Sequence, residues 1–137
     1  MEIQRTLNVP AEYFYDRMIH SVVYDIDQST GRTLKKSQLE GFEYIKTFSK
    51  NNHAKIIIEK TEQNHKYQYR TVTTRNEFIA SYEITPVDDQ TCEVLYHESM
   101  KSIGFIQQAN DFVVGLVLGY FKKKQFKAML EGIEASY

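Results

Sequence analysis

The sequence predicts an α+β domain in which a curved antiparallel sheet of about six strands wraps around one long C-terminal helix. Three observations lead to this fold class. A short alternating segment precedes an amphipathic one, residues 39–100 alternate with period two, and residues 102–137 are apolar in their middle and free of proline. We therefore expect the order strand, helix, five strands, helix, in a single domain covering residues 1–137.

The N-terminal segment has the pattern of a strand followed by a helix. Glu2 to Asn8 alternates between apolar and polar residues, and Pro10 and Glu12 suit the first turn of a helix. The helix should run to about Ile26, because apolar residues recur every four positions, at Phe14, Met18, Val22 and Ile26. Ser29-Thr30-Gly31 should end it, and a loop or short helical turn should cover Arg32 to Gln38.

The middle of the chain predicts five strands. They are expected at Leu39–Ser49, Ala54–Thr61, Lys66–Thr74, Glu77–Pro86 and Thr91–Met100. Asparagine and aspartate residues, which tolerate turn geometry, separate several of these segments. Because the connections are short, the strands should pair antiparallel throughout.

The alternation assigns the side chains of this sheet to two faces. The inward set is mostly aromatic or aliphatic: Phe42, Tyr44, Ile56, Ile58, Tyr67, Tyr69, Phe78, Ala80, Tyr82, Ile84, Val94 and Tyr96. The opposite set is mostly charged, but it also holds Ile45, Ile57, Ile79 and Leu95. These four residues mark either a homodimer contact or the ordinary apolar fraction of a surface.

The C-terminal segment predicts a helix that is apolar on most sides between Phe112 and Phe121. Gly115 and Gly119 would each cost such a helix on the order of 1 kcal/mol relative to alanine. Close contact with a strand, or a ligand in a cavity, would offset that cost. The lysines at 122–124 and 127 have the pattern of a solvated face, with an acidic or phosphate-bearing partner as the alternative.

Composition excludes several classes of function. The formal net charge is −1, which argues against a nucleic-acid partner. Cys92 is the only cysteine, so no intramolecular disulfide forms, and four scattered histidines predict neither a metal site nor a cofactor. No apolar signal segment follows Met1, and the apolar run in the last helix is too short to cross a bilayer. We therefore expect a soluble, cytoplasmic protein without membrane insertion.

Short motifs add a resemblance to a known superfamily. Val9-Pro10-Ala11-Glu12, after the first strand, resembles the entry to the first helix in START-like, or Bet v 1-like (SRPBCC), proteins. Four further segments look like an uncharacterised bacterial START-like family, catalogued as a domain of unknown function: Gly41–Tyr44, Tyr82–Ile84, Tyr96–Glu98 and Asn110–Lys124. The resemblance covers essentially the whole chain and implies the helix-grip fold. It also implies a link to carbohydrate uptake, since genes of that family often lie near those for β-glucoside transport.

Arg5 and Glu98 form the most informative charged pair. Both have inward parity, and the helix-grip fold makes the first and last strands neighbours. Inward charges are costly unless they are paired. We therefore expect an ion pair near one mouth of the cavity, which either fixes strand register or holds the polar head of a ligand.

Three functions are compatible with these observations. The first is a non-enzymatic protein that binds a small hydrophobic or amphipathic ligand between the sheet and the last helix, because tyrosines supply apolar walls with polar tips. Its ligand-binding residues would be Arg5, Phe42, Tyr44, Tyr67, Tyr69, Tyr82, Tyr96, Glu98, Asn110 and Val114. The second is a cyclase-like or hydrolase-like enzyme that uses Glu98 as acid or base. The third is a regulatory or interaction module with a filled core.

Overall fold

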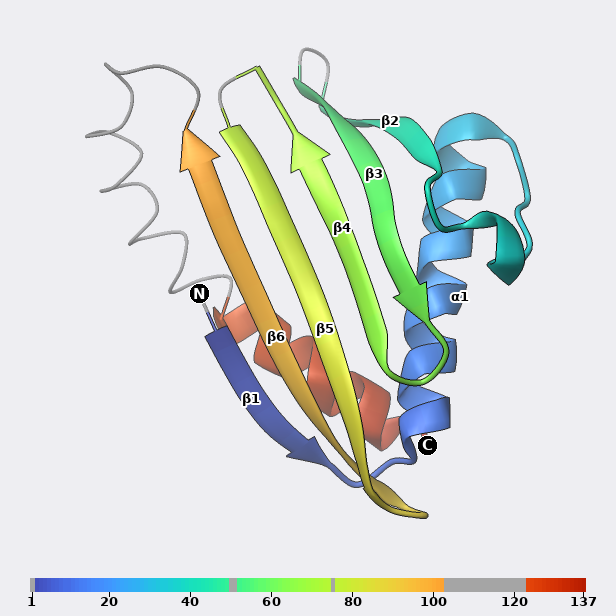
Figure 1. Cartoon of the computed structure of the whole chain (residues 1–137), viewed down its shortest axis with the longest axis vertical. Coiled ribbons are helices and arrows are strands. Elements are labelled where there is room, and N and C mark those ends of the chain that lie inside the picture. The colour runs from blue at the N-terminus through green and yellow to red at the C-terminus, as the bar shows by residue number, and fades with distance from the viewer. Residues whose placement is uncertain (1, 50–51, 75, 103–122) are drawn as a thin grey trace.

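The computed structural model describes residues 2–49, 52–74, 76–102 and 123–137, and it confirms the predicted fold class (Figure 1). The elements follow one another as β1 (Glu2–Leu7), α1 (Ala11–Thr30), the 3₁₀ turn η1 (Lys36–Gln38), β2 (Glu43–Ser49), β3 (Asn52–Glu62), β4 (Lys66–Val72), β5 (Asn76–Asp88) and β6 (Thr91–Ser102). Residues 123–135 form the described part of the C-terminal helix.

The strands form one antiparallel sheet in the order β1-β6-β5-β4-β3-β2. The first strand therefore joins the sheet beside the last one, and the remaining strands follow as consecutive hairpins. Register shifts interrupt the ladders between Ile58 and Lys60 in β3 and between Pro86 and Asp88 in β5. Such irregularities bend and twist strands, which suits the curved sheet seen in Figure 1.

Two element boundaries lie four residues from the predicted ones, and several strand ends lie one or two residues away. The first helix continues to Thr30, where Gly31 adopts a left-handed φ of 75° and its N–H donates to the Asp27 carbonyl at 2.8 Å. The second strand begins at Glu43 rather than at Leu39. Leu39 is fully buried at the end of η1, and Gly41 turns the chain with a φ of 85° before β2.

The two faces of the sheet follow the predicted alternation. Most of the inward set is buried, including Tyr44, Ile58 and Val94, whereas Ile45 on the opposite face is 55% exposed. A homodimer contact through this outer face stays a prediction.

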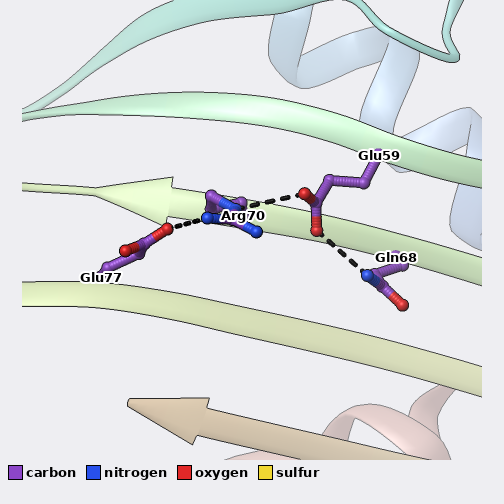
Figure 2. Close-up of polar contacts among 4 residues, drawn as sticks. All are labelled: Glu59, Gln68, Arg70 and Glu77. Atoms are coloured by element: carbon purple, nitrogen blue, oxygen red, sulfur yellow. Dashed lines mark hydrogen bonds and ion pairs between the residues drawn. The ribbon is translucent and has the colours of Figure 1, made fainter. Parts of the chain in front are cut away.

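A polar network ties β3, β4 and β5 together on the outer face (Figure 2). Arg70 on β4 donates from Nε to Glu59 on β3 at 3.1 Å and from its terminal nitrogen to Glu77 on β5. Gln68 donates to the other oxygen of Glu59 at 3.0 Å. These side chains therefore link three consecutive strands of the sheet.

The described part of the C-terminal helix packs on the inner face of the sheet. Phe126 and Leu130 are buried, and the ring of Phe126 stacks on Tyr96 with centroids 4.4 Å apart. Of the predicted helix over 102–137, residues 103–122 lie outside the described ranges, and Ser102 ends β6 instead of starting a helix. None of the described helices is both long and apolar enough to span a membrane.

The end of this helix is fastened to the N-terminal part of the chain. The Asn8 backbone N–H donates to a Glu134 carboxylate oxygen at 2.7 Å. Tyr13, in the first turns of α1, hydrogen-bonds Ser136 at 2.7 Å, and its ring meets that of Tyr137 edge-on at 4.7 Å. These contacts set the distance between α1 and the C-terminal helix.

Candidate ligand-binding site

A cavity of about 490 Å³ lies between α1, the inner face of the sheet and the C-terminal segment. Volumes of this size are typical of small-molecule sites. The lining comes from three parts of the fold: Phe14, Arg17, Met18, Ser21, Val22 and Asp25 of α1; Tyr44, Lys46, Ile56, Tyr67, Tyr69 and Tyr82 of the sheet; and Met129, Gly132, Ile133 and Ser136.

The α1 wall carries a polar row beside its apolar stripe. Arg17, Ser21 and Asp25 recur every four residues, so they line one side of the helix. Arg17 and Ser21 are exposed, whereas Phe14 and Met18 beside them are buried. The wall from Phe14 to Asp25 spans about 16 Å, at about 1.5 Å per residue. The cavity is therefore bounded by an apolar inner surface and a polar rim.

Four tyrosines form the sheet wall. Tyr67 on β4 lies directly opposite Tyr82 on β5, and Tyr69 lies opposite the small Ala80. The ring centroids of Tyr67 and Tyr69 are 5.4 Å apart, and those of Tyr67 and Tyr82 are 6.1 Å apart. These tilted rings form a continuous aromatic surface that faces α1.

Asp25 anchors the polar end of the cavity. Its Oδ2 accepts a hydrogen bond from the Tyr44 hydroxyl at 2.6 Å, and its Oδ1 pairs with Lys46 Nζ at 2.8 Å. Burial raises the pKa of Tyr44, and the hydrogen bond to Asp25 raises it further. The Tyr44 hydroxyl therefore remains protonated at physiological pH, and both oxygens of Asp25 already have a partner within the protein.

The other three tyrosines are also held in the protonated form. Burial raises the pKa of Tyr69 to about 12, with Glu98 and Asp25 as further causes. It raises the pKa of Tyr67 and of Tyr82 as well. The cavity thus presents neutral hydroxyl groups on an aromatic wall.

The structure places the predicted ligand-binding residues in different locations. Tyr44, Tyr67, Tyr69 and Tyr82 line the cavity, and Asn110 and Val114 lie outside the described residues.

Two of the predicted aromatic residues have partners elsewhere. Phe42 is half-buried beneath the guanidinium of Arg32, 5.3 Å from the ring centroid. Tyr96 stacks on Phe126 and donates its hydroxyl to Glu98. Neither Phe42 nor Tyr96 is among the described lining residues.

The expected ion pair between Arg5 and Glu98 is wrong. Arg5 lies opposite Val94 and is exposed, while the carboxylate of Glu98 accepts a hydrogen bond from Tyr96. Glu98 lies four positions beyond Val94 in β6, which is roughly 13 Å along a strand. The two residues share a face of the sheet, but the stagger of β1 against β6 keeps them apart. Neither is among the described residues that line the cavity.

The polar groups of the cavity were missed at the sequence level. Arg17, Ser21 and Asp25 precede the apolar residues Met18, Val22 and Ile26 by one position each, and this spacing is visible in the chain. It would have identified a helix edge that borders a pocket. No such pattern distinguishes Lys46 in the sequence, because it is one of several charged residues in the predicted strands.

The part of the chain that the structure describes contains no candidate metal site. No three histidine, cysteine, aspartate or glutamate side chains gather there in a way that would hold an ion. The chemistry of the cavity is therefore that of hydrogen bonding, one ion pair and apolar contact.

Comparison with solved structures shows the class of fold. Norcoclaurine synthase from Thalictrum flavum, in complex with dopamine and hydroxybenzaldehyde, matches with a TM-score of 0.65 at 8% identity, over 98% of this chain and 83% of that one. The Zhui aromatase/cyclase from Streptomyces sp. R1128 matches with a TM-score of 0.64 at 11% identity, over 98% and 92%. A START superfamily protein from Mycobacterium smegmatis matches with a TM-score of 0.61 at 9% identity, over 100% and 98%. The chain therefore has the START-like helix-grip fold.

The family itself is shown by the sequence. Residues 1–119 match the model of a domain of unknown function, DUF3284, and the chain belongs to that family. No curated protein matches the sequence. The family match agrees with the resemblance seen in the motifs, and it assigns neither a reaction nor a ligand.

Proposed function

We propose that this protein binds a small hydrophobic or amphipathic molecule in the cavity between α1, the sheet and the C-terminal helix. The observation that carries the proposal is a cavity of about 490 Å³ whose walls are mostly apolar and aromatic, with a few polar groups from Arg17, Asp25 and Lys46. Ligand sites in proteins have this composition. An interaction module with a filled core would not contain a cavity of this volume.

A solved structure with the same fold supports ligand binding as a use of this fold. Norcoclaurine synthase, which shares the fold, is described in complex with two small aromatic molecules. The enzyme hypothesis built on Glu98 gains no support from the geometry, because its carboxylate is engaged by Tyr96 and it is not among the described lining residues. Ligand binding without catalysis is therefore the function that we propose.

Gly132 offers a direct test. It lines the cavity from the C-terminal helix, and a Cβ atom built there has no described atom within 4 Å apart from its chain neighbours and the backbone of its own helix. A phenylalanine at this position would occupy part of the open volume. Replacing a helical glycine also removes a local cost of about 0.5–1 kcal/mol, so the variant should fold at least as well as the wild type.

The assay is a titration with prodan, a neutral naphthyl ketone whose emission reports the polarity of its surroundings. Gly132→Phe should lose most of the binding seen in the wild type, and the matched control Gly132→Ala should retain it. Thermal unfolding of both variants verifies that the fold is intact. Equal binding by Gly132→Phe and the wild type would show that the probe does not occupy this cavity, and the proposal would fail.

A further inference from the structure

Three cavity-lining tyrosines have hydroxyl groups without a hydrogen-bond partner among the described residues. Tyr44 donates to Asp25 and Tyr96 donates to Glu98. Among the described residues, no hydrogen-bond partner is found for the hydroxyls of Tyr67, Tyr69 and Tyr82. These three residues adjoin one another on β4 and β5, and the ring of Tyr67 lies 5.4 Å from that of Tyr69 and 6.1 Å from that of Tyr82, so the three form one group on the wall.

Two of these side chains are almost completely buried. Tyr67 is 5% exposed and Tyr82 is 9% exposed, and both line the cavity. Among the described residues, Asn64 Oδ1 is the one fully buried side-chain polar atom without a partner, so the hydroxyls of Tyr67 and Tyr82 are open to the cavity rather than sealed in the core. A molecule that enters the cavity can therefore hydrogen-bond to these hydroxyls.

The chemistry of that partner follows from the protonation of the tyrosines. Burial raises the pKa of all three phenols, so each hydroxyl has a proton to donate at physiological pH. A phenol hydroxyl that donates needs an acceptor, such as a carbonyl, ether or hydroxyl oxygen. Asp25 does not compete for this role, because its two oxygens are taken by Tyr44 and Lys46.

The charge of the partner follows from the carboxylates nearby. Asp25 lines the cavity, and Asp25 and Glu98 both raise the pKa of Tyr69, whereas the cation Lys46 is paired with Asp25 and Arg17 lies at the exposed rim. An anionic ligand group at the same place would add a third negative charge to this region. A neutral acceptor avoids that repulsion and still satisfies the hydroxyls.

From the three hydroxyls without a described partner on the aromatic wall, we infer that the ligand is an uncharged, oxygen-bearing ring compound whose oxygens accept hydrogen bonds from the hydroxyls of Tyr67, Tyr69 and Tyr82. The inference rests on the proposed function and specifies the ligand class for the same cavity. The ring of the ligand packs against the tyrosine wall, and its oxygen points toward the sheet. The opposite end of the ligand faces the polar rim at Arg17 and Ser21.

Three naphthalenes of nearly equal shape test this ligand class: a naphthyl methyl ketone, isopropylnaphthalene and the naphthoate anion. Their affinities are measured by calorimetry on the wild type and on Tyr67→Phe, Tyr82→Phe and the control Tyr24→Phe. Tyr24 is 63% exposed and lies outside the described lining, so its hydroxyl cannot reach the probe. Each substitution removes one oxygen and leaves the ring, so the apolar walls are unchanged.

The ratio of ketone affinity to isopropylnaphthalene affinity should fall roughly three- to tenfold in Tyr67→Phe and in Tyr82→Phe, which is the contribution of one neutral hydrogen bond. It should not change in Tyr24→Phe, and naphthoate should bind the wild type more weakly than the ketone. An unchanged ratio in both cavity variants, or tightest binding by naphthoate, would overturn the ligand class while the proposed function stands. If none of the three probes binds, the proposed function itself fails, and this inference fails with it.

Discussion

The tyrosines of the inner face divide into two groups that should differ in their effect on stability. The hydroxyl of Tyr44 donates to the Asp25 carboxylate at 2.6 Å, whereas that of Tyr82 has no partner among the described residues. Substitution by phenylalanine removes one oxygen atom in each case. We predict that Tyr44→Phe destabilises the ligand-free protein and that Tyr82→Phe does not.

The magnitude follows from the geometry. A hydrogen bond to a charged group contributes about 1.5–3 kcal/mol, and the lower end applies because the Asp25 side chain is 30% exposed and keeps its ion pair with Lys46. For a chain of 137 residues the unfolding entropy near the midpoint is about 0.29 kcal/mol per kelvin. Tyr44→Phe should therefore lower Tm by about 5 °C. Tyr82→Phe should change it by less than about 2 °C, since no partner is left unpaired.

Differential scanning calorimetry of the two variants and the wild type, after organic extraction to remove any bound molecule, measures this difference. An equal loss of Tm in both variants would refute the reasoning. It would mean that the Tyr82 hydroxyl has a protein partner, and the argument for an acceptor-bearing ligand would lose its basis.

Three further predictions concern the stability of the folded protein. Leu130→Ala should destabilise the protein by about 3 kcal/mol in chemical denaturation, because Leu130 is 2% exposed, whereas Met129→Ala next to it, 41% exposed, should cost less than about 1 kcal/mol. Burial raises the pKa of Tyr69 to about 12, so the folded state binds its phenol proton more tightly than the unfolded state does. The resulting contribution to folding stability is complete below pH 10 and should be lost as the pH rises from about 10 to about 12. A Tyr69→Phe variant should therefore show a shallower alkaline loss of stability. Arg70→Met should lower Tm by removing the link between two glutamates on the outer face, and high salt should shrink the difference from the wild type.

Alternation with period two predicted the faces of the sheet well. A strand side chain points to one of two faces, so the alternation of apolar and polar residues within each strand was enough to place Tyr44, Tyr67 and Tyr82 on the inner face, where they are buried. Parity does not determine how far one strand is shifted along its neighbour. For this reason Arg5 and Glu98 share a face yet lie too far apart to pair.

The cavity was harder to predict than the fold. Aromatic residues on the inner face can fill a core or line a pocket, and the choice depends on where a helix settles over the sheet. In this chain the contacts of Tyr13 and Asn8 with the C-terminal segment position that helix, and they join residues more than a hundred positions apart. The polar row on α1 was visible as a pattern, but its role depends on that long-range packing.

Native mass spectrometry tests the central claim, that the cavity holds a ligand, most directly. The protein is measured as purified, after organic extraction, and again after incubation of the extracted protein with prodan. We predict an added mass of one molecule per chain that extraction removes and prodan replaces, with no prodan adduct in Gly132→Phe. A single ligand-free mass under all three conditions would contradict the account.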